Sequence, residues 1–178
     1  MKKTLTLLAL LALAIMVEAQ TPGAAQRAEM KRLDFLLGQW QGEGWIMLGQ
    51  GERRTFKQTE TVQSKLDGLL MVVDGLGKGK TPEKQEEVVV HNAFAVVSYD
   101  NETKTFRWRA YRADGFALDT EGKVGDKSLA WGFRSPQGGD IRFTINLTEK
   151  DQWNEVGEFS RDGKSWIKFF EMTLQRMK

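Results

Sequence analysis

Carboxylates and amides occupy positions in this chain where the surrounding pattern predicts buried apolar side chains. In residues 55–66, the face that carries Phe56 and Val62 also carries Gln58 and Glu60. Burying an ionised carboxylate costs several kcal/mol unless an ion pair or hydrogen bonds compensate it. Glu60 must therefore point outward, pair with an arginine such as Arg109 or Arg142, or line a wet cavity.

Glu155 raises the same question on another strand, because it shares a face with Trp153. For Glu155 an outward or paired position is favoured. A wet cavity that combines Gln58 and Glu60 with aromatic rings would suit an amphipathic ligand, and two inward carboxylates could also exchange protons. The candidate ligand-binding residues are Gln58, Glu60, His91, Trp108, Trp131, Phe143 and Glu155.

The chain has one histidine, His91, and no cysteine. This composition excludes a Cys–His nucleophile pair and a multi-histidine metal centre, so no catalytic or metal-binding residue is assigned. His91 lies in the run 88–94, where a hydrogen-bonded histidine in a strand or bulge is the simplest interpretation. The alternatives are a pocket group that binds a ligand or transfers a proton, and an axial haem ligand.

These side chains need a sheet to position them. From residue 39 onward, turn signals recur at short spacing between runs rich in Val, Ile, Thr, Phe and Trp, which predicts about ten strands. Short connections make sequence neighbours antiparallel neighbours, and closure removes exposed edges, so we predict an all-β, up-and-down barrel. The predicted strands are 40–48, 55–66, 69–76, 87–99, 105–111, 116–124, 128–134, 141–148, 153–160 and 166–175.

Alternation within the strands assigns their faces. Trp108, Trp131 and Phe143 are predicted to point inward, and so is Leu66; Arg107, Arg109, Arg142, Thr144 and Asn146 are predicted to point outward. Either face of 166–175 could be inward. The glycine-rich stretch 75–84 is predicted as a mobile hairpin loop, since its spacing and the absence of a following helix do not fit a phosphate loop.

One amphipathic helix precedes the strands, over residues 24–37, and Gly38 is suited to end it. Such a helix is expected to cap one end of the barrel, with Trp40 packed beneath it. Gly42 and Gly44 would let the first strand bend around the closing barrel.

The opening segment Leu37-Gly38-Gln39-Trp40-Gln41-Gly42-Glu43-Gly44 resembles the G-x-W opening of the calycin superfamily of lipocalin, fatty-acid-binding and nitrobindin-like barrels. Residues 91–100, 106–108 and 153–163 also resemble an uncharacterised secreted bacterial family on that fold. The resemblance implies a small apolar or amphipathic ligand inside the barrel. Nitrobindin-like proteins bind haem through a histidine near the C-terminus, whereas residues 166–178 contain none, so no cofactor is expected.

The N-terminus indicates export. Lys2 and Lys3 precede an apolar run over 5–17, which predicts a signal peptide over residues 1–19 and a single domain over 20–178 in the periplasm or outside the cell. A net charge of +2 with interspersed signs gives no field to attract nucleic acid or a membrane.

The expected protein is a monomeric or homodimeric binder of a small hydrophobic or amphipathic molecule, without a membrane span. The alternatives are a hydrolase or isomerase using Glu60 and His91, and a structural or interaction barrel.

Overall fold

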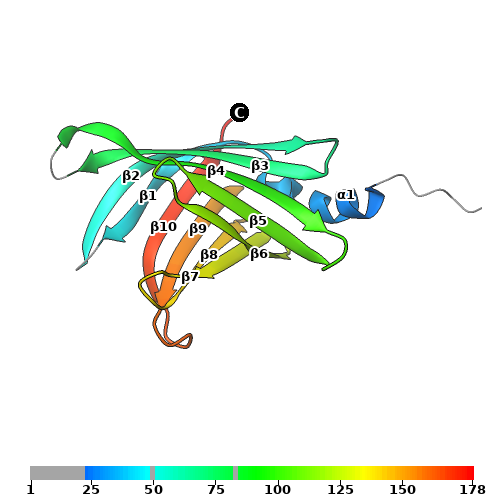
Figure 1. Cartoon of the computed structure of the whole chain (residues 1–178). Helices are drawn as coiled ribbons and strands as arrows, with labels where there is room; N and C mark the ends of the chain where they lie inside the picture. The colour runs from blue at the N-terminus through cyan, green and yellow to red at the C-terminus, as the bar shows by residue number, and fades with distance from the viewer. Residues whose placement is uncertain (1–22, 49–50, 82–83) are drawn as a thin grey trace, which may run out of the picture.

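The computed structural model describes residues 23–48, 51–81 and 84–178, and its ten strands close into one antiparallel barrel (Figure 1). Each strand pairs with its neighbours in sequence, and β1 closes the barrel against β10. The predicted fold is confirmed. The strands are β1 (Gly38–Leu48), β2 (Glu52–Lys65), β3 (Leu70–Thr81), β4 (Lys84–Asp100), β5 (Thr105–Arg112), β6 (Ala117–Gly125), β7 (Ser128–Arg134), β8 (Asp140–Leu147), β9 (Gln152–Ser160) and β10 (Ile167–Arg176).

The predicted signal peptide lies outside the described residues, and none of the described helices is long and apolar enough to cross a membrane.

Inside the barrel, burial follows the two-residue period of the strands. On β2, the inward Phe56, Gln58, Glu60 and Val62 are buried while Lys57 and its odd-numbered neighbours are largely exposed. Alternation therefore places Gln58 and Glu60 in the lumen.

The predicted helix is present but divided in two. An α-helix, α1 (Ala24–Met30), passes into a 3-10 helix, η1 (Lys31–Leu36), and Gly38 follows with a φ of 126°. The tighter winding turns Leu33 and Leu36 onto the barrel, where both are fully buried. Figure 1 shows the helix at one end of the barrel.

Trp40 seals the barrel below this helix, as predicted. Its indole N–H donates to the Leu36 carbonyl oxygen at 2.8 Å, and its ring meets Trp153 edge-on at a centroid distance of 5.7 Å. The guanidinium of Arg176 lies 4.0 Å from the Trp40 ring centroid and donates to the carbonyl oxygens of Phe35 and Leu37. The C-terminal strand thereby ties the helix to the first strand.

Two predictions about β3 and β2 are wrong. The stretch 75–84 is not a mobile loop, because β3 continues to Thr81 and β4 begins at Lys84; residues 82–83 lie outside the described part. Gly75 and Gly77 are buried inward positions of β3, opposite Glu60 and Gln58. Leu66 is not inward: it leaves β2 with a φ of 50° and is 66% exposed.

The ambiguous last strand has a definite orientation. Met172 and Leu174 are buried in the core, with Phe170 packed against it, while Glu171 lies outside and pairs with Lys168 at 3.1 Å. A register shift between Lys168 and Phe170 interrupts the pairing with β9. Because the shift displaces the alternation at that point, the pattern before it does not predict the face after it.

Candidate functional site

Gln58 and Glu60 form a buried polar pair on the inward face of β2. Gln58 Nε2 donates to Glu60 Oε1 at 2.7 Å, and Glu60 is only 7% exposed. A Cβ on Gly75 would lie 2.7 Å from Glu60 Oε2, and one on Gly77 would lie 2.5 Å from Gln58 Oε1. The glycines of β3 therefore provide the space that the two polar side chains occupy.

Glu155 approaches the same region from β9. It is also 7% exposed, and its Oε2 accepts a hydrogen bond from Trp153 Nε1 at 3.1 Å. The charge of Glu60 acts on Glu155 directly. The expectation that Glu155 points outward or pairs with a base is wrong: it is inward, and the described residues give neither carboxylate an ion-pair partner. We call Gln58, Glu60 and Glu155 the lumenal polar group.

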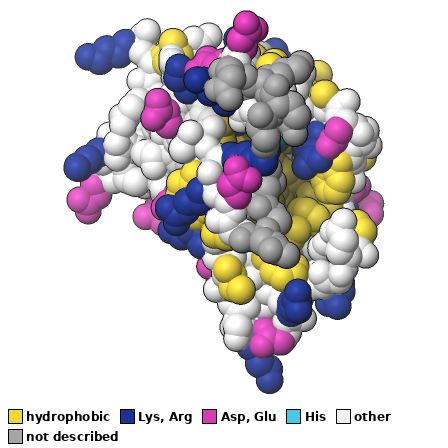
Figure 2. All heavy atoms as spheres, turned by 90° about the vertical axis from the view of Figure 1, so that its left-hand side faces the viewer, with side chains coloured by type: hydrophobic (Ala, Val, Ile, Leu, Met, Phe, Trp, Pro, Cys, Tyr) yellow, Lys and Arg dark blue, Asp and Glu magenta, His cyan; other side chains and the backbone are white. Residues whose placement is uncertain are grey.

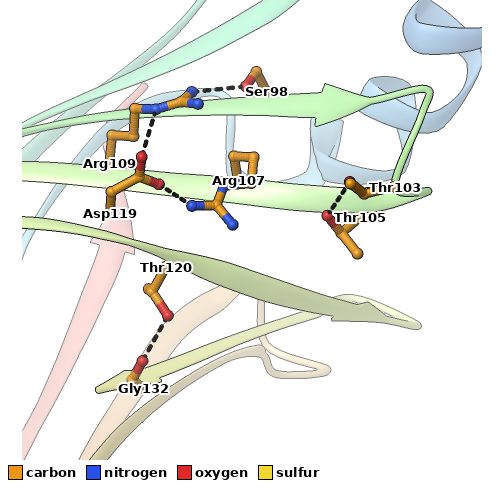
Figure 3. Close-up of polar contacts among 8 residues, drawn as sticks. All are labelled: Ser98, Thr103, Thr105, Arg107, Arg109, Asp119, Thr120 and Gly132. Atoms are coloured by element: carbon orange, nitrogen blue, oxygen red, sulfur yellow. Dashed lines mark hydrogen bonds and ion pairs between the residues drawn. The ribbon is translucent and has the colours of Figure 1, made fainter. Parts of the chain in front are cut away.

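The arginines that could have neutralised these carboxylates are engaged outside the barrel. Figure 3 shows Arg107 and Arg109 both bonded to Asp119, with Arg109 also donating to Ser98 at 3.3 Å. Arg142 donates to Glu158 at 2.7 Å. The predicted outward orientation of these arginines is confirmed, and it leaves the lumen without their positive charge.

Burial has a direct effect on the two acids. It raises the pKa of Glu60 to about 7, with the charge of Asp74 adding to the rise and the Gln58 hydrogen bond opposing it. Burial and the Glu60 charge raise the pKa of Glu155 to about 8, against the Trp153 hydrogen bond. The two acids titrate as a coupled system that holds about one to two protons at neutral pH. The lumenal polar group can therefore both donate and accept hydrogen bonds.

A continuous series of ring contacts lines the lumen beside this group. Trp108 stacks on Trp131 with centroids 4.1 Å apart, and Trp131 stacks on Phe143 at 5.5 Å. Phe143 meets Phe170 edge-on at 5.8 Å, and Phe170 stacks on Phe56 at 5.7 Å. Phe56 neighbours Gln58 on the inward face of β2. We call these five residues, drawn from β5, β7, β8, β10 and β2, the aromatic wall.

Trp108 carries an unused hydrogen-bond donor. The residue is 6% exposed, and its indole Nε1 is fully buried with no hydrogen-bond partner. A buried donor without a partner loses the hydrogen bonds it makes to water in the unfolded chain. A ligand atom that accepts this hydrogen bond would recover that loss.

Solvent reaches the aromatic wall from the end opposite the helix. Trp131, Phe143 and Phe170 point inward yet are only partly buried. Figure 2 faces this end and shows hydrophobic side chains in a recess among charged and polar groups. Two hollows of about 470 and 370 Å³ lie at the helical end, one beside Arg32 and Lys127 and the other beside Arg27 and Ser64, and both are outside the lumen.

His91 shares the inward face of β4 with Ala95 and Val97, at a part of the strand that is open to solvent. It pairs with Gly77 across the β3–β4 ladder and remains exposed, while local packing and the charge of Arg112 lower the pKa of its imidazole. Among the described contacts, no hydrogen bond or ion pair joins His91 to Glu60. The structure thus brings Gln58, Glu60 and Glu155 together. His91 lies on the same side of the sheet, across Gly77 from Gln58: a Cβ on Gly77 would lie 2.5 Å from Gln58 Oε1 and 2.9 Å from His91 Cβ.

The last strand supplies no histidine to the lumen. The residues of β10 that face it are Phe170, Met172 and Leu174, and the one histidine is exposed on β4. Among the described residues, no group of three or more His, Cys, Asp or Glu side chains is placed to hold a metal ion.

Sequence reasoning missed Phe56 and Phe170 as members of the wall, and Gly75 and Gly77 as the residues that make room for the polar pair. Glycine at every second position of 75–79 was an available signal. It matches the two-residue period of a strand, and opposite the alternating Gln58 and Glu60 it indicates close packing within a sheet.

Comparison with known proteins supports the architecture. No family model matches the chain, and no curated protein matches it. The fold is similar to the crystal structure of Rv2717c from M. tuberculosis, with a TM-score of 0.62 and 10% identity over 84% of this chain and 97% of that one. A DUF3598-family protein of unknown function from Nostoc punctiforme gives a TM-score of 0.43 and 13% identity over 81% of this chain and 48% of that one. The first likeness shows a shared fold.

Proposed function

We propose that the protein is an exported binding protein that holds a small amphipathic molecule in the barrel lumen. The observation that carries this proposal is the junction between the aromatic wall and the lumenal polar group, where Phe56 and Gln58 are neighbours on one face of β2. Ligand sites typically combine apolar walls with a few convergent polar groups in this way. The N-terminal sequence pattern supports export.

The ligand's apolar part lies against Trp131 and Phe143, which solvent already reaches, and its polar end meets Gln58, Glu60 and Glu155. Aromatic side chains gain most from a flat partner, because offset stacking adds to area burial. The proposal assigns His91 no acid or base role: it lies across Gly77 from Gln58 and has no hydrogen bond or ion pair to Glu60 among the described contacts. The proposal is therefore one of binding without catalysis.

Native mass spectrometry of the protein purified from its own host tests this function. We expect a small molecule to remain with the wild type and to be lost from Trp131→Ala, which removes the middle of the aromatic wall. Trp45→Ala is the matched control, because Trp45 lies on the outer face beneath Arg53, whose guanidinium is 3.8 Å from its ring centroid. Equal retention in both variants, or no retained molecule in any sample, would contradict lumenal binding.

A further inference from the structure

We propose that the lumenal site selects an organic cation: a protonated amine on an apolar, ring-bearing body, with its ammonium held by Gln58, Glu60 and Glu155. This inference rests on the proposed function and adds the chemical class of the ligand. The only ionisable side chains found in the lumenal polar group are two carboxylates, each nine-tenths or more buried. An anionic ligand would be repelled by whichever acid is ionised. A neutral ligand could only exchange hydrogen bonds with the acids, whereas an ammonium also compensates the charge of the ionised forms.

The hydrogen-bonding capacity of the group matches an ammonium. A primary ammonium has three donors and no acceptor. The oxygens available to it belong to the Glu60 carboxylate, the Glu155 carboxylate and the Gln58 amide, which already donates through Nε2 to Glu60. Charge-assisted bonds of this kind are stronger than neutral ones.

The aromatic wall supports the same class of ligand. Phe56 is two residues from Gln58 on the inward face of β2, and Phe170 pairs with Gly157, two residues from Glu155 on β9. The two rings stack on each other, and ring faces attract a cation within about 6 Å of their centroids. The described residues provide no third metal-ligating acid, histidine or cysteine at this place. An organic cation therefore fits better than a metal ion.

Trp108 provides an independent indication that a ligand occupies the lumen. Trp108 and Phe56 are the two ends of the series of ring contacts. The buried Trp108 Nε1, which has no hydrogen-bond partner among the described residues, is therefore at the end of the aromatic wall away from Phe56. A ligand oxygen or nitrogen that accepts this bond would be remote from the ammonium. The inferred ligand thus has a cationic end, a ring-bearing middle and an acceptor atom.

Proton release gives a further signature. Because burial keeps both carboxyls partly protonated near neutral pH, binding of an ammonium moves those protons to the buffer. The affinity for the ammonium should rise as the pH increases from about 6 to 8, through the range in which the two acids ionise. Two other titratable groups lie near this pair: Asp74 on β3, whose charge adds to the raised pKa of Glu60, and His91, across Gly77 from Gln58, whose pKa is below its ordinary value. A neutral ligand that accepts bonds from the protonated acids should show the opposite trend.

Isothermal titration calorimetry with three matched probes tests the inference: 2-naphthylmethylamine, 2-naphthalenemethanol and 2-naphthoate. We expect the amine to bind the wild type about tenfold or more tightly than the alcohol at pH 7.5, with proton release, and the naphthoate to bind most weakly. Glu60→Gln/Glu155→Gln should abolish the preference for the amine and retain binding of the alcohol. Glu121→Gln, which changes an exposed carboxylate on the outer face of β6, should leave the preference unchanged.

The outcomes separate the two proposals. Equal affinity for amine and alcohol in the wild type, or a preference for the amine that survives Glu60→Gln/Glu155→Gln, would overturn cation selection and leave lumenal binding standing. Failure of all three probes to bind would contradict both. Circular dichroism of each variant confirms that a lost preference occurs in a folded barrel.

Discussion

The helical end of the barrel and the middle of its lumen are built from the same alternating strands, yet they differ in chemistry. At the helical end, Trp40, Leu33 and Leu36 are fully buried, and the Trp40 indole has its partner in a backbone carbonyl. In the lumen, the residues that the structure describes give the buried Glu60 and Glu155 no counter-charge and the Trp108 indole no hydrogen-bond partner. At the helical end, the buried polar group has a hydrogen-bond partner within the protein. In the lumen, a ligand can supply the counter-charge and the hydrogen-bond acceptor that the buried groups lack.

The largest difference between the regions should appear in stability. Trp40→Ala removes the seal beneath the helix, and large-to-small core changes of this kind cost about 3–5 kcal/mol. Phe143→Ala, in the partly solvated aromatic wall, should cost less because water already reaches that ring. Urea unfolding measures both, and an equal loss would show that the lumen is packed like the sealed end.

The acids of the lumen should make stability depend on pH. Each has a folded-state pKa above its ordinary value of 4.5, so its contribution is fully present below pH 4.5 and is lost as the pH rises through about 7 and 8. The wild type should therefore lose on the order of 3 kcal/mol or more between pH 5 and pH 8.5. Glu60→Gln/Glu155→Gln should flatten this slope. A wild-type stability that stays constant over that range would contradict the burial of both acids.

Two glycines offer a finer comparison within the sheet. A Cβ on Gly42 would lie 2.1 Å from the Thr173 carbonyl oxygen, which is backbone and cannot move aside, so Gly42→Ala should cost about 1–3 kcal/mol. A Cβ on Gly75 meets the movable carboxylate of Glu60. Gly75→Ala should cost less stability but weaken binding of the amine probe. Denaturant unfolding and calorimetry on both variants check this, and a reversed order in either measurement would contradict the assignment.

The smallest change in stability is expected at the contacts by which Arg176 joins the helix to the barrel. Arg176 donates to Phe35 O at 2.9 Å and pairs with Asp151 at 2.9 Å, both near the surface. Arg176→Met keeps the stem and removes these bonds, which should cost about 1 kcal/mol and leave the affinity of the probes unchanged. Thermal unfolding measures the first effect. A large loss of probe binding would mean that the sealed end and the lumen are coupled.

Strand alternation and turn spacing were sufficient to predict the barrel, the helix and the inward positions of Trp108 and Trp131, but they left the direction of Glu60 open. The same periodicity failed at β10, where a register shift between Lys168 and Phe170 displaces the alternation. Leu66 was misassigned because a turn begins where the apolar pattern continues.

The candidate site was only partly predictable, because its assembly depends on contacts between distant strands. The approach of β9 to β2, which brings Glu155 near Glu60, follows from closure of the barrel and its strand register. No local pattern contains that information. His91 was included because its type suggests chemistry. The register places it across Gly77 from Gln58, and the described contacts give it no hydrogen bond or ion pair to either acid.

The most direct test follows the indole N–H signals by two-dimensional ¹H–¹⁵N NMR during titration with 2-naphthylmethylamine. If the lumen is the binding site, the resonances of Trp108 and Trp153 should shift, because the first lacks a partner and the second donates to Glu155. The resonance of Trp40, held by the Leu36 carbonyl at the sealed end, should stay in place. Trp45 and Trp166 lie outside the barrel, against Arg53 and Arg142 respectively. Shifts confined to these two, or no shift at Trp108, would contradict a ligand site formed by the aromatic wall and the lumenal polar group.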